Sequence, residues 1–186
     1  MSTGTLLAIV ISVVVLVVVI AAVVTVTMRR RRRLRQRFGP EYDRTVADAG
    51  SRREAEHDLD ARESRHDSLD IRPLPAAARN RYQQSWSEVQ EEFVDRPDEA
   101  VGKADRLVTA LMRERGYPTE GYEQQMRDLS VEHGRTLEHY RTAHDTLALS
   151  SSEPVTTEQL RGAMVHYRAL FEELLEDSDH RDPDRS

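Results

Sequence analysis

The chain of 186 residues contains no cysteine, a single lysine and only eight glycines. The absence of cysteine excludes disulfides, thiolate nucleophiles and cysteine-ligated zinc, and it agrees with a reducing location. The scattered glycines form neither of the loops that cradle phosphates, G-x-x-x-x-G-K-[ST] and G-x-G-x-x-G. A G-x-S-x-G turn and an H-E-x-x-H motif are also missing, and the seven histidines are expected to be solvated or at the edge of a core. We therefore expect no enzymatic activity, no cofactor and no metal site.

Charge is absent from 23 consecutive residues, Leu6 to Met28. A helix of this length extends ~34 Å, enough to cross a hydrocarbon core of ~30 Å. Ten of these residues are valine, which favours helices weakly in water, but in lipid only a helix satisfies the backbone of a single segment. The sequence predicts a transmembrane helix at residues 6–28, preceded by a short outside N-terminus at residues 1–5.

A block of seven arginines follows the apolar segment directly, whereas no charged side chain precedes it. Basic flanks stay on the cytoplasmic side, so we expect the N-terminus outside and the rest of the chain in the cytoplasm. A cleaved signal peptide is the alternative, but it requires the basic residues before a shorter apolar run. The block is also the predicted membrane-surface contact, and its members are Arg29, Arg30, Arg31, Arg32, Arg33, Arg35 and Arg37.

Three interactions of the anchor region follow from these patterns. The arginine block has a sufficient role as a topology signal, but it also suits anionic lipids or the acidic part of the chain. Small residues at Gly4, Ala8 and Ser12 are spaced for close approach of two anchors, a weak indication of a homodimer. The lipid bilayer, anionic lipids and a second copy are thus the expected partners of the anchor.

All 33 acidic residues lie after Arg37, together with 20 of the 27 basic ones, which leaves residues 38–186 with a formal charge of −13. A domain this acidic repels nucleic acid, whose affinity for proteins comes largely from neutralised phosphates. We therefore expect no nucleic-acid partner.

Two segments are predicted between the anchor and a folded domain. Residues 29–50 form a basic juxtamembrane segment with a short helix, which begins near Pro40 and ends near Gly50. Residues 51–72 begin with an S-x-x-E capping box, Ser51 to Glu54, and contain few apolar residues. This composition predicts a solvated helical stalk, and the alternative is disorder, because a segment that buries little cannot offset its ordering entropy.

Residues 73–176 contain four amphipathic segments with apolar residues at steps of three and four, the period of a helix. The third runs from Thr119 to about Leu149, and Gly134 is placed to bend or split it. A Thr156–Gln159 capping box begins the fourth. The fold class is therefore all-α: one N-terminal transmembrane helix, a charged helical stalk, a small antiparallel bundle, and a disordered acidic tail at residues 177–186.

Several phrases of the sequence resemble a family of uncharacterised single-span membrane proteins from actinobacteria. They are RFGPEYDR (37–44), IRPL (71–74), RYQQSWSEVQEEFVDRP (81–97), ADRLVTALMRERGYP (104–118), LSVEH (129–133) and AMVHYRALFEELL (163–175). The resemblance implies a bacterial inner (plasma) membrane location, and it brings no activity, ligand or site residue with it.

These observations lead to a leading functional hypothesis and two rivals. The first is a membrane-tethered cytoplasmic helical domain that acts as an adaptor or scaffold for a protein partner that the sequence does not identify. One rival is a protein that organises anionic lipids through its juxtamembrane arginines and uses the domain as a spacer. The other is an unrecognised enzyme, for which we expect a deep polar pocket in the bundle.

Overall fold

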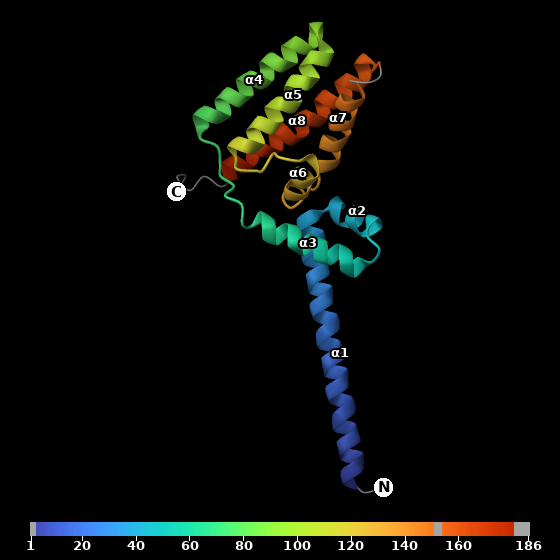
Figure 1. The fold of residues 1–186 in the computed structure, drawn as a ribbon. Coiled ribbons are helices and arrows are strands. Elements are labelled where there is room, and N and C mark those ends of the chain that lie inside the picture. The colour runs from blue at the N-terminus through green and yellow to red at the C-terminus, as the bar shows by residue number, and fades with distance from the viewer. Residues whose placement is uncertain (1–2, 151–153, 181–186) are drawn as a thin grey trace.

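The computed structural model describes residues 3–150 and 154–180, which form eight α-helices and no strand (Figure 1). The all-α prediction is confirmed. A long helix extends away from a helical domain, which lies at its C-terminal end. The helices are α1 (Thr3–Phe38), α2 (Pro40–Asp48), α3 (Arg52–His66), α4 (Ala76–Asp95), α5 (Pro97–Glu114), α6 (Tyr122–Leu129), α7 (Leu137–Ser150) and α8 (Thr157–His180).

Helix α1 is long and apolar enough to cross a membrane over Ile11–Phe38, and its apolar part makes no contact with the domain. It does not end at Met28, the last residue before the arginine block. Because arginine is a good helix former, the helix continues through the arginine block to Phe38. Gly39, with φ of 55°, then turns the chain into α2. The predicted small-residue series lies partly outside the residues whose side chains the structure describes.

Helices α4, α5, α7 and α8 form the predicted bundle. The α4–α5 and α7–α8 hairpins are antiparallel, and they meet through α5 and α8, which run in the same direction (Figure 1). Most of the periodic residues predicted for the core are buried, whereas Phe93, Tyr122 and Leu147 are only partly buried. Trp86 of α4 stacks on Phe171 of α8 with 4.7 Å between ring centroids. The aromatic residues Trp86, Tyr140 and Tyr167 belong to this core.

The long third segment is split, as the position of Gly134 allowed. Helix α6 ends at Leu129 and α7 begins at Leu137. A Cβ atom at Gly134 would clash with the backbone carbonyl oxygen of Phe38. Glycine at this position therefore lets the α6–α7 connection lie directly against the end of α1.

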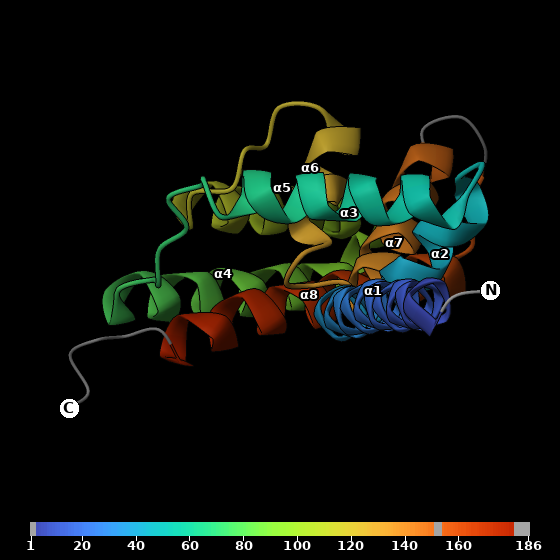
Figure 2. The ribbon, with the colours of Figure 1, turned by 90° about the horizontal axis from the view of Figure 1, so that it is seen from below.

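The segment predicted as a solvated stalk is helical, but its placement differs from the prediction. Ser51 caps α3 through its hydroxyl, which accepts a hydrogen bond from the backbone N–H of Glu54, as expected. However, α3 crosses the end of α1 instead of extending the chain away from it (Figure 2). The cause is packing on two sides, since α3 buries Ala55 and Leu59 and contacts both α1 and α6. The domain therefore lies directly at the end of the long helix.

The tail also differs from its prediction at its first residues. Helix α8 continues to His180, so residues 177–180 are helical. The remainder of the predicted tail, residues 181–186, lies outside the described residues.

Candidate functional site: the arginine block and the charged junction

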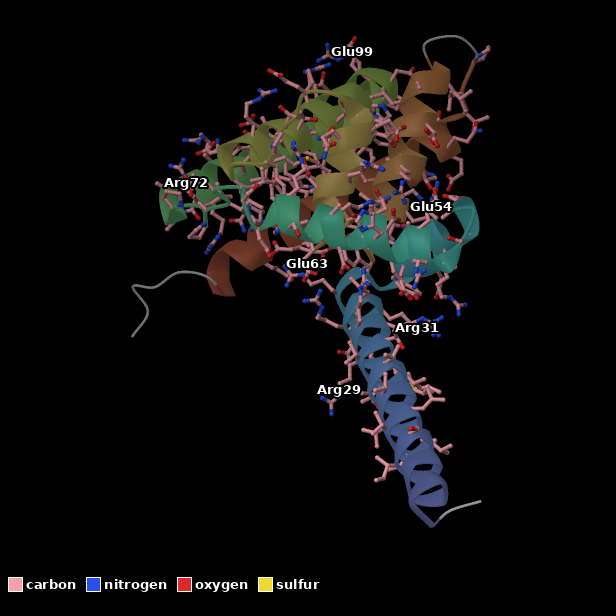
Figure 3. The ribbon with its side chains drawn as sticks, turned by 60° about the horizontal axis from the view of Figure 1, so that its bottom comes forward. Arg29, Arg31, Glu54, Glu63, Arg72 and Glu99 are labelled. Carbon is pink, nitrogen blue, oxygen red and sulfur yellow. The ribbon has the colours of Figure 1, made fainter. Side chains whose placement is uncertain are left out.

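Most of the arginine block faces an acidic stripe on α3. Glu56, Asp60, Glu63 and Asp67 follow one another at steps of four, three and four, and therefore lie on one face of the helix and its end. Four arginines of α1 form ion pairs with this stripe. Figure 3 shows Glu63 on α3 beside the end of α1. The ion pairs are Arg30–Asp60, Arg31–Glu56 at 3.3 Å, Arg33–Glu63 at 2.9 Å, and Arg37 with Glu63 and Asp67 at 3.6 Å each.

The remaining three arginines differ in their surroundings. Arg35 pairs with Asp43 of α2 at 2.8 Å and lies over the ring of Tyr42. Arg29 and Arg32 form no ion pair with the side chains that the structure describes, and both are exposed. Their three-residue spacing places them on one side of α1, in the turn next to the apolar segment. The structure thus divides the block into five paired guanidinium groups and two free ones.

A small apolar cluster lies behind these ion pairs and contains Leu34, Phe38, Tyr42, Leu59 and Val131. These residues come from α1, α2, α3 and the α6–α7 connection, so the cluster joins the long helix to the domain. The hydroxyl of Tyr42 donates a hydrogen bond to Glu56 at 2.8 Å. Burial and this bond both raise the pKa of Tyr42, which stays protonated and remains a donor at neutral pH.

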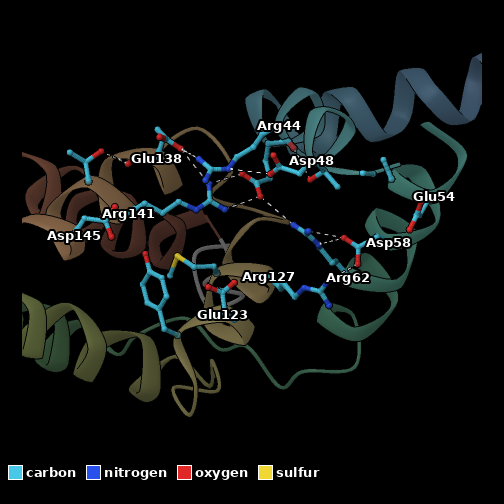
Figure 4. A pocket seen from close by; sticks show the side chains of 17 residues that line it. Arg44, Asp48, Glu54, Asp58, Arg62, Glu123, Arg127, Glu138, Arg141 and Asp145 are labelled. Atoms are coloured by element: carbon cyan, nitrogen blue, oxygen red, sulfur yellow. Dashed lines mark hydrogen bonds and ion pairs between the residues drawn. The ribbon is translucent and has the colours of Figure 1, made fainter. Parts of the chain in front are cut away.

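Glu41, in the first turn of α2, is an enclosed carboxylate of the junction, with 4% of its side chain exposed. Both of its oxygens accept hydrogen bonds from the guanidinium of Arg141 on α7, at 2.8 and 2.9 Å. Arg62 of α3 approaches the same carboxylate at 3.3 Å and also pairs with Asp58 at 2.7 Å. Arg62 and Arg141 thus both bind Glu41, and Figure 4 shows their guanidinium groups near each other at the pocket, with dashed lines into the space between them. A two-point guanidinium–carboxylate contact fixes direction as well as distance, so the triad orients α2 and α3 on the bundle.

A pocket of about 550 Å³ opens at this junction between α2, α3, α6 and α7. Seven carboxylates and four arginines line it, together with Tyr122 and Met126 (Figure 4). All four arginines are engaged by carboxylates: Arg44 by Glu138 at 2.5 Å, Arg127 by Asp58 at 2.9 Å, and Arg62 and Arg141 by Glu41. The pocket is therefore lined by ion pairs that join α2 and α3 to α6 and α7.

A buried series of polar side chains runs from the α5–α6 connection through the α6–α7 connection to α8. The hydroxyl of Tyr117 lies 3.2 Å from Glu132 and 3.1 Å from the Nε2 atom of His133. The Nδ1 atom of His133 lies 3.2 Å from Glu173, which also accepts a hydrogen bond from Thr136. Although burial opposes it, these hydrogen bonds lower the pKa of Glu173. A phenol, an imidazole and a carboxylate follow one another in this series, as they do in a catalytic relay. Because Tyr117 and His133 are at most 2% exposed, we assign the series a structural role. It connects the loops on either side of α6 to α8, and we call it the polar lock.

The sequence indicated the arginine block but not its partners. The acidic stripe of α3 is visible as a periodic pattern, although nothing in it specifies α1 as the opposite surface. Glu41 and Arg141 are 100 residues apart, and neither has a local signal that sets it apart from the other charged residues. The histidine pair His139 and His166 was missed for the same reason, because the residues lie on different helices.

No family model, curated protein or solved structure matches this chain. The fold and the junction themselves define a helical protein in which one candidate membrane-spanning helix is built into a helical domain by an apolar cluster and a ring of ion pairs.

Proposed function

We propose that the chain is a single-span protein of the bacterial inner membrane whose cytoplasmic helical domain is a non-enzymatic adaptor or scaffold for a protein partner. The observation that carries this proposal is the complete burial of Leu34 and Phe38, which belong to the same continuous helix as the apolar segment. A helix that is part of both the membrane anchor and the domain core holds the domain in one orientation. A flexible linker between span and domain would be sufficient if the anchor only had to keep the domain at the membrane surface.

The position of the domain relative to lipid follows from the helix rise. If Met28 lies at the edge of the hydrocarbon core, Leu34 lies ~9 Å beyond it. The polar layer of each leaflet is about 5 to 7 Å thick, so the domain stands against the headgroups with no stalk between them. A partner would therefore meet the bundle at the membrane surface.

The orientation is proposed from the arginine block, which favours the cytoplasmic side. Because the chain has no cysteine, single introduced cysteines report topology without background. In intact cells, a cysteine at Ser2 should react with an impermeant thiol reagent, and a cysteine at the exposed Ser87 should react only after permeabilisation. The reverse pattern would refute the orientation, and a chain recovered from the medium without its N-terminus would refute the anchor.

The adaptor role is tested by comparing the proteins captured by two membrane-embedded forms. Proximity labelling from the full chain should identify partners that are lost when residues 51–186 are deleted and the anchor is kept. The truncated form retains the span and all seven arginines, so it controls for proteins that are near the membrane by chance. An identical set of labelled proteins from both forms would contradict the adaptor role.

The second candidate function is recruitment of anionic lipid, and the free guanidinium groups of Arg29 and Arg32 favour it. A basic side chain near an anionic surface gains ~1 kcal/mol. In nanodiscs with a fluorescent anionic lipid, R29Q/R32Q should reduce lipid enrichment around the protein more than R33Q/R37Q, which removes arginines that already face carboxylates. Equal reductions by the two pairs would show that the ion pairs with α3 do not restrict lipid contact.

A further inference from the structure

Two histidines from neighbouring helices converge on the surface of the bundle. His139 lies on α7 and His166 on α8, and their Nδ1 atoms are 3.0 Å apart. The ring centroids are 4.9 Å apart and the ring planes differ by 18°. The two rings are stacked with nearly parallel planes, and their Nδ1 atoms lie at hydrogen-bond distance from each other.

Two imidazole nitrogens at this separation match the ligand spacing of one transition-metal ion. Imidazole nitrogen binds such an ion at ~2.0–2.1 Å, so two nitrogens at a right angle are ~2.9 Å apart and two at the tetrahedral angle are ~3.4 Å apart. The observed 3.0 Å lies within this interval. Rotation of each ring about χ2 turns the facing lone pairs toward a common point, and this torsion is broad for histidine.

The protonation state of the pair also suits a metal ligand. In the metal-free protein, one neutral ring donates its Nδ1–H to the Nδ1 atom of the other. Burial lowers the pKa of His166, and the charge of His139 lowers it further. The Nδ1 lone pair of His166 is therefore available at neutral pH. When a cation binds both Nδ1 atoms, the Nδ1 proton of the donor ring moves to the Nε2 atom of the same ring.

We propose that His139 and His166 form a binding site for one borderline divalent metal ion, such as Zn²⁺, Ni²⁺ or Cu²⁺, that bridges α7 and α8. Imidazole ligands suit these ions, and affinity should follow the order Cu²⁺ above Ni²⁺ and Zn²⁺. No group of three or more histidine, cysteine or carboxylate side chains lies at metal-binding distance among the described residues. Water or a group from another molecule completes the coordination.

The site lies apart from the arginine block and the junction pocket, so it is independent of the adaptor proposal. Its consequence within the chain is a cross-link between the last two helices of the bundle. The two residues are 27 positions apart, and a metal ion that joins them closes the α7–α8 hairpin in the folded state only. Binding should therefore raise the thermal stability of the full chain.

The test uses the full chain in nanodiscs, with Cu²⁺ and then Zn²⁺ as the probe, measured by isothermal titration calorimetry at pH 7.5. The wild-type protein should bind one equivalent tightly, and H139Q and H166Q should each bind at least about tenfold more weakly, since loss of even a supporting group costs that much. The matched control is H57Q, which removes an exposed histidine of α3. Circular dichroism establishes that each variant is folded, as expected for substitutions at the surface.

Spectroscopy on the Cu²⁺ form provides a second readout. Pulsed EPR should show coupling to two imidazole nitrogens in wild-type protein and in H57Q, and to one or none in H139Q. The proposal is overturned if H139Q and H166Q bind as tightly as wild type, or if H57Q loses as much affinity as they do. It is also overturned if tight binding persists with a single coupled imidazole.

Discussion

The bundle core contains 25 buried hydrophobic residues, whereas the cluster that joins the long helix to the domain contains five. In the bundle, apolar stripes of four helices face one another. At the junction with α1, the few apolar side chains are surrounded by arginine–carboxylate pairs. Burial of apolar surface is non-directional, while a two-point guanidinium contact fixes orientation. The bundle thus supplies stability, and the junction supplies the angle between α1 and the domain.

The largest effect is expected in the bundle core. Trp86→Ala removes a ring that stacks on Phe171 and should lower the free energy of unfolding by ~3 to 5 kcal/mol. Urea unfolding of the full chain in micelles, followed by circular dichroism, measures this loss. Val94→Ala is the control, because Val94 is 81% exposed, and its cost should stay within ~0.5 kcal/mol. Equal costs for the two variants would contradict the assignment of the core.

Glu41→Gln should have the next largest effect, and its effect should be local. The substitution leaves Arg62 and Arg141 without their shared carboxylate, and breaking an enclosed pair costs ~3 to 5 kcal/mol. We expect a cost at the lower end of this range, since 13% of the Arg62 side chain and 15% of the Arg141 side chain are exposed to solvent. Hydrogen exchange should accelerate in α2 and α3 and remain slow in α4 and α5.

Glu138→Gln is the matched control for this experiment. Glu138 pairs with Arg44 of α2 and with Arg141 of its own helix, but its side chain is 63% exposed. Exposed pairs contribute less than ~1 kcal/mol. Faster exchange throughout the bundle in Glu41→Gln would show that the junction and the bundle unfold as one unit, which would contradict their separate roles.

Gly134→Ala tests the close approach of the α6–α7 connection to the end of α1. The added Cβ would meet the Phe38 carbonyl oxygen, and relief of such overpacking costs ~1 to 3 kcal/mol. Gly162→Ala is the opposite case, since no atom lies within 4 Å of its new Cβ. Because Gly162 lies inside α8, alanine at this position should raise the free energy of unfolding by ~1 kcal/mol. Thermal unfolding of both variants measures the contrast, and a destabilised Gly162→Ala would contradict the helix packing.

The smallest effect is a pH dependence at the polar lock. Since the pKa of Glu173 is lowered in the folded protein from 4.5, its contribution to stability is complete above about pH 4.5 and is lost as pH falls through the native pKa. Glu173→Gln should therefore be less stable than wild type at pH 7, and the difference should shrink below pH 4.5. Glu172→Gln changes an exposed neighbour, and its effect on stability should not depend on pH in this way. If the stability difference between Glu173→Gln and wild type stayed constant with pH, the role assigned to Glu173 would be contradicted.

Particular residues explain which features the sequence predicts and which it does not. The stripe predicted for α4 contains Ala78, Tyr82, Trp86, Val89 and Phe93. All but Phe93, which is partly buried, lie in the core, because helical periodicity records burial locally. The Thr156–Gln159 capping box is also confirmed, since both of its bonds are formed within four residues. Local patterns of this kind need no knowledge of the partner surface.

The placement of α3 was not predictable in this way. Its apolar face contains only Ala55 and Leu59, which resembles a solvated helix, and the acidic stripe that secures it pairs with arginines about 25 to 30 positions earlier. Charge complementarity between distant segments has no period, so it cannot be read from either segment alone. The His139–His166 pair escaped prediction on the same ground.

A spin-label distance tests most directly whether α1 and the helical domain form one rigid unit, as the burial of Leu34 and Phe38 indicates. Labels at cysteines introduced at Gln36 of α1 and Gln90 of α4, both exposed, should give a single narrow distance distribution by pulsed EPR in nanodiscs. Glu41→Gln should broaden it. A broad distribution in the otherwise unaltered chain would show that the domain swings freely on its anchor and would contradict the account.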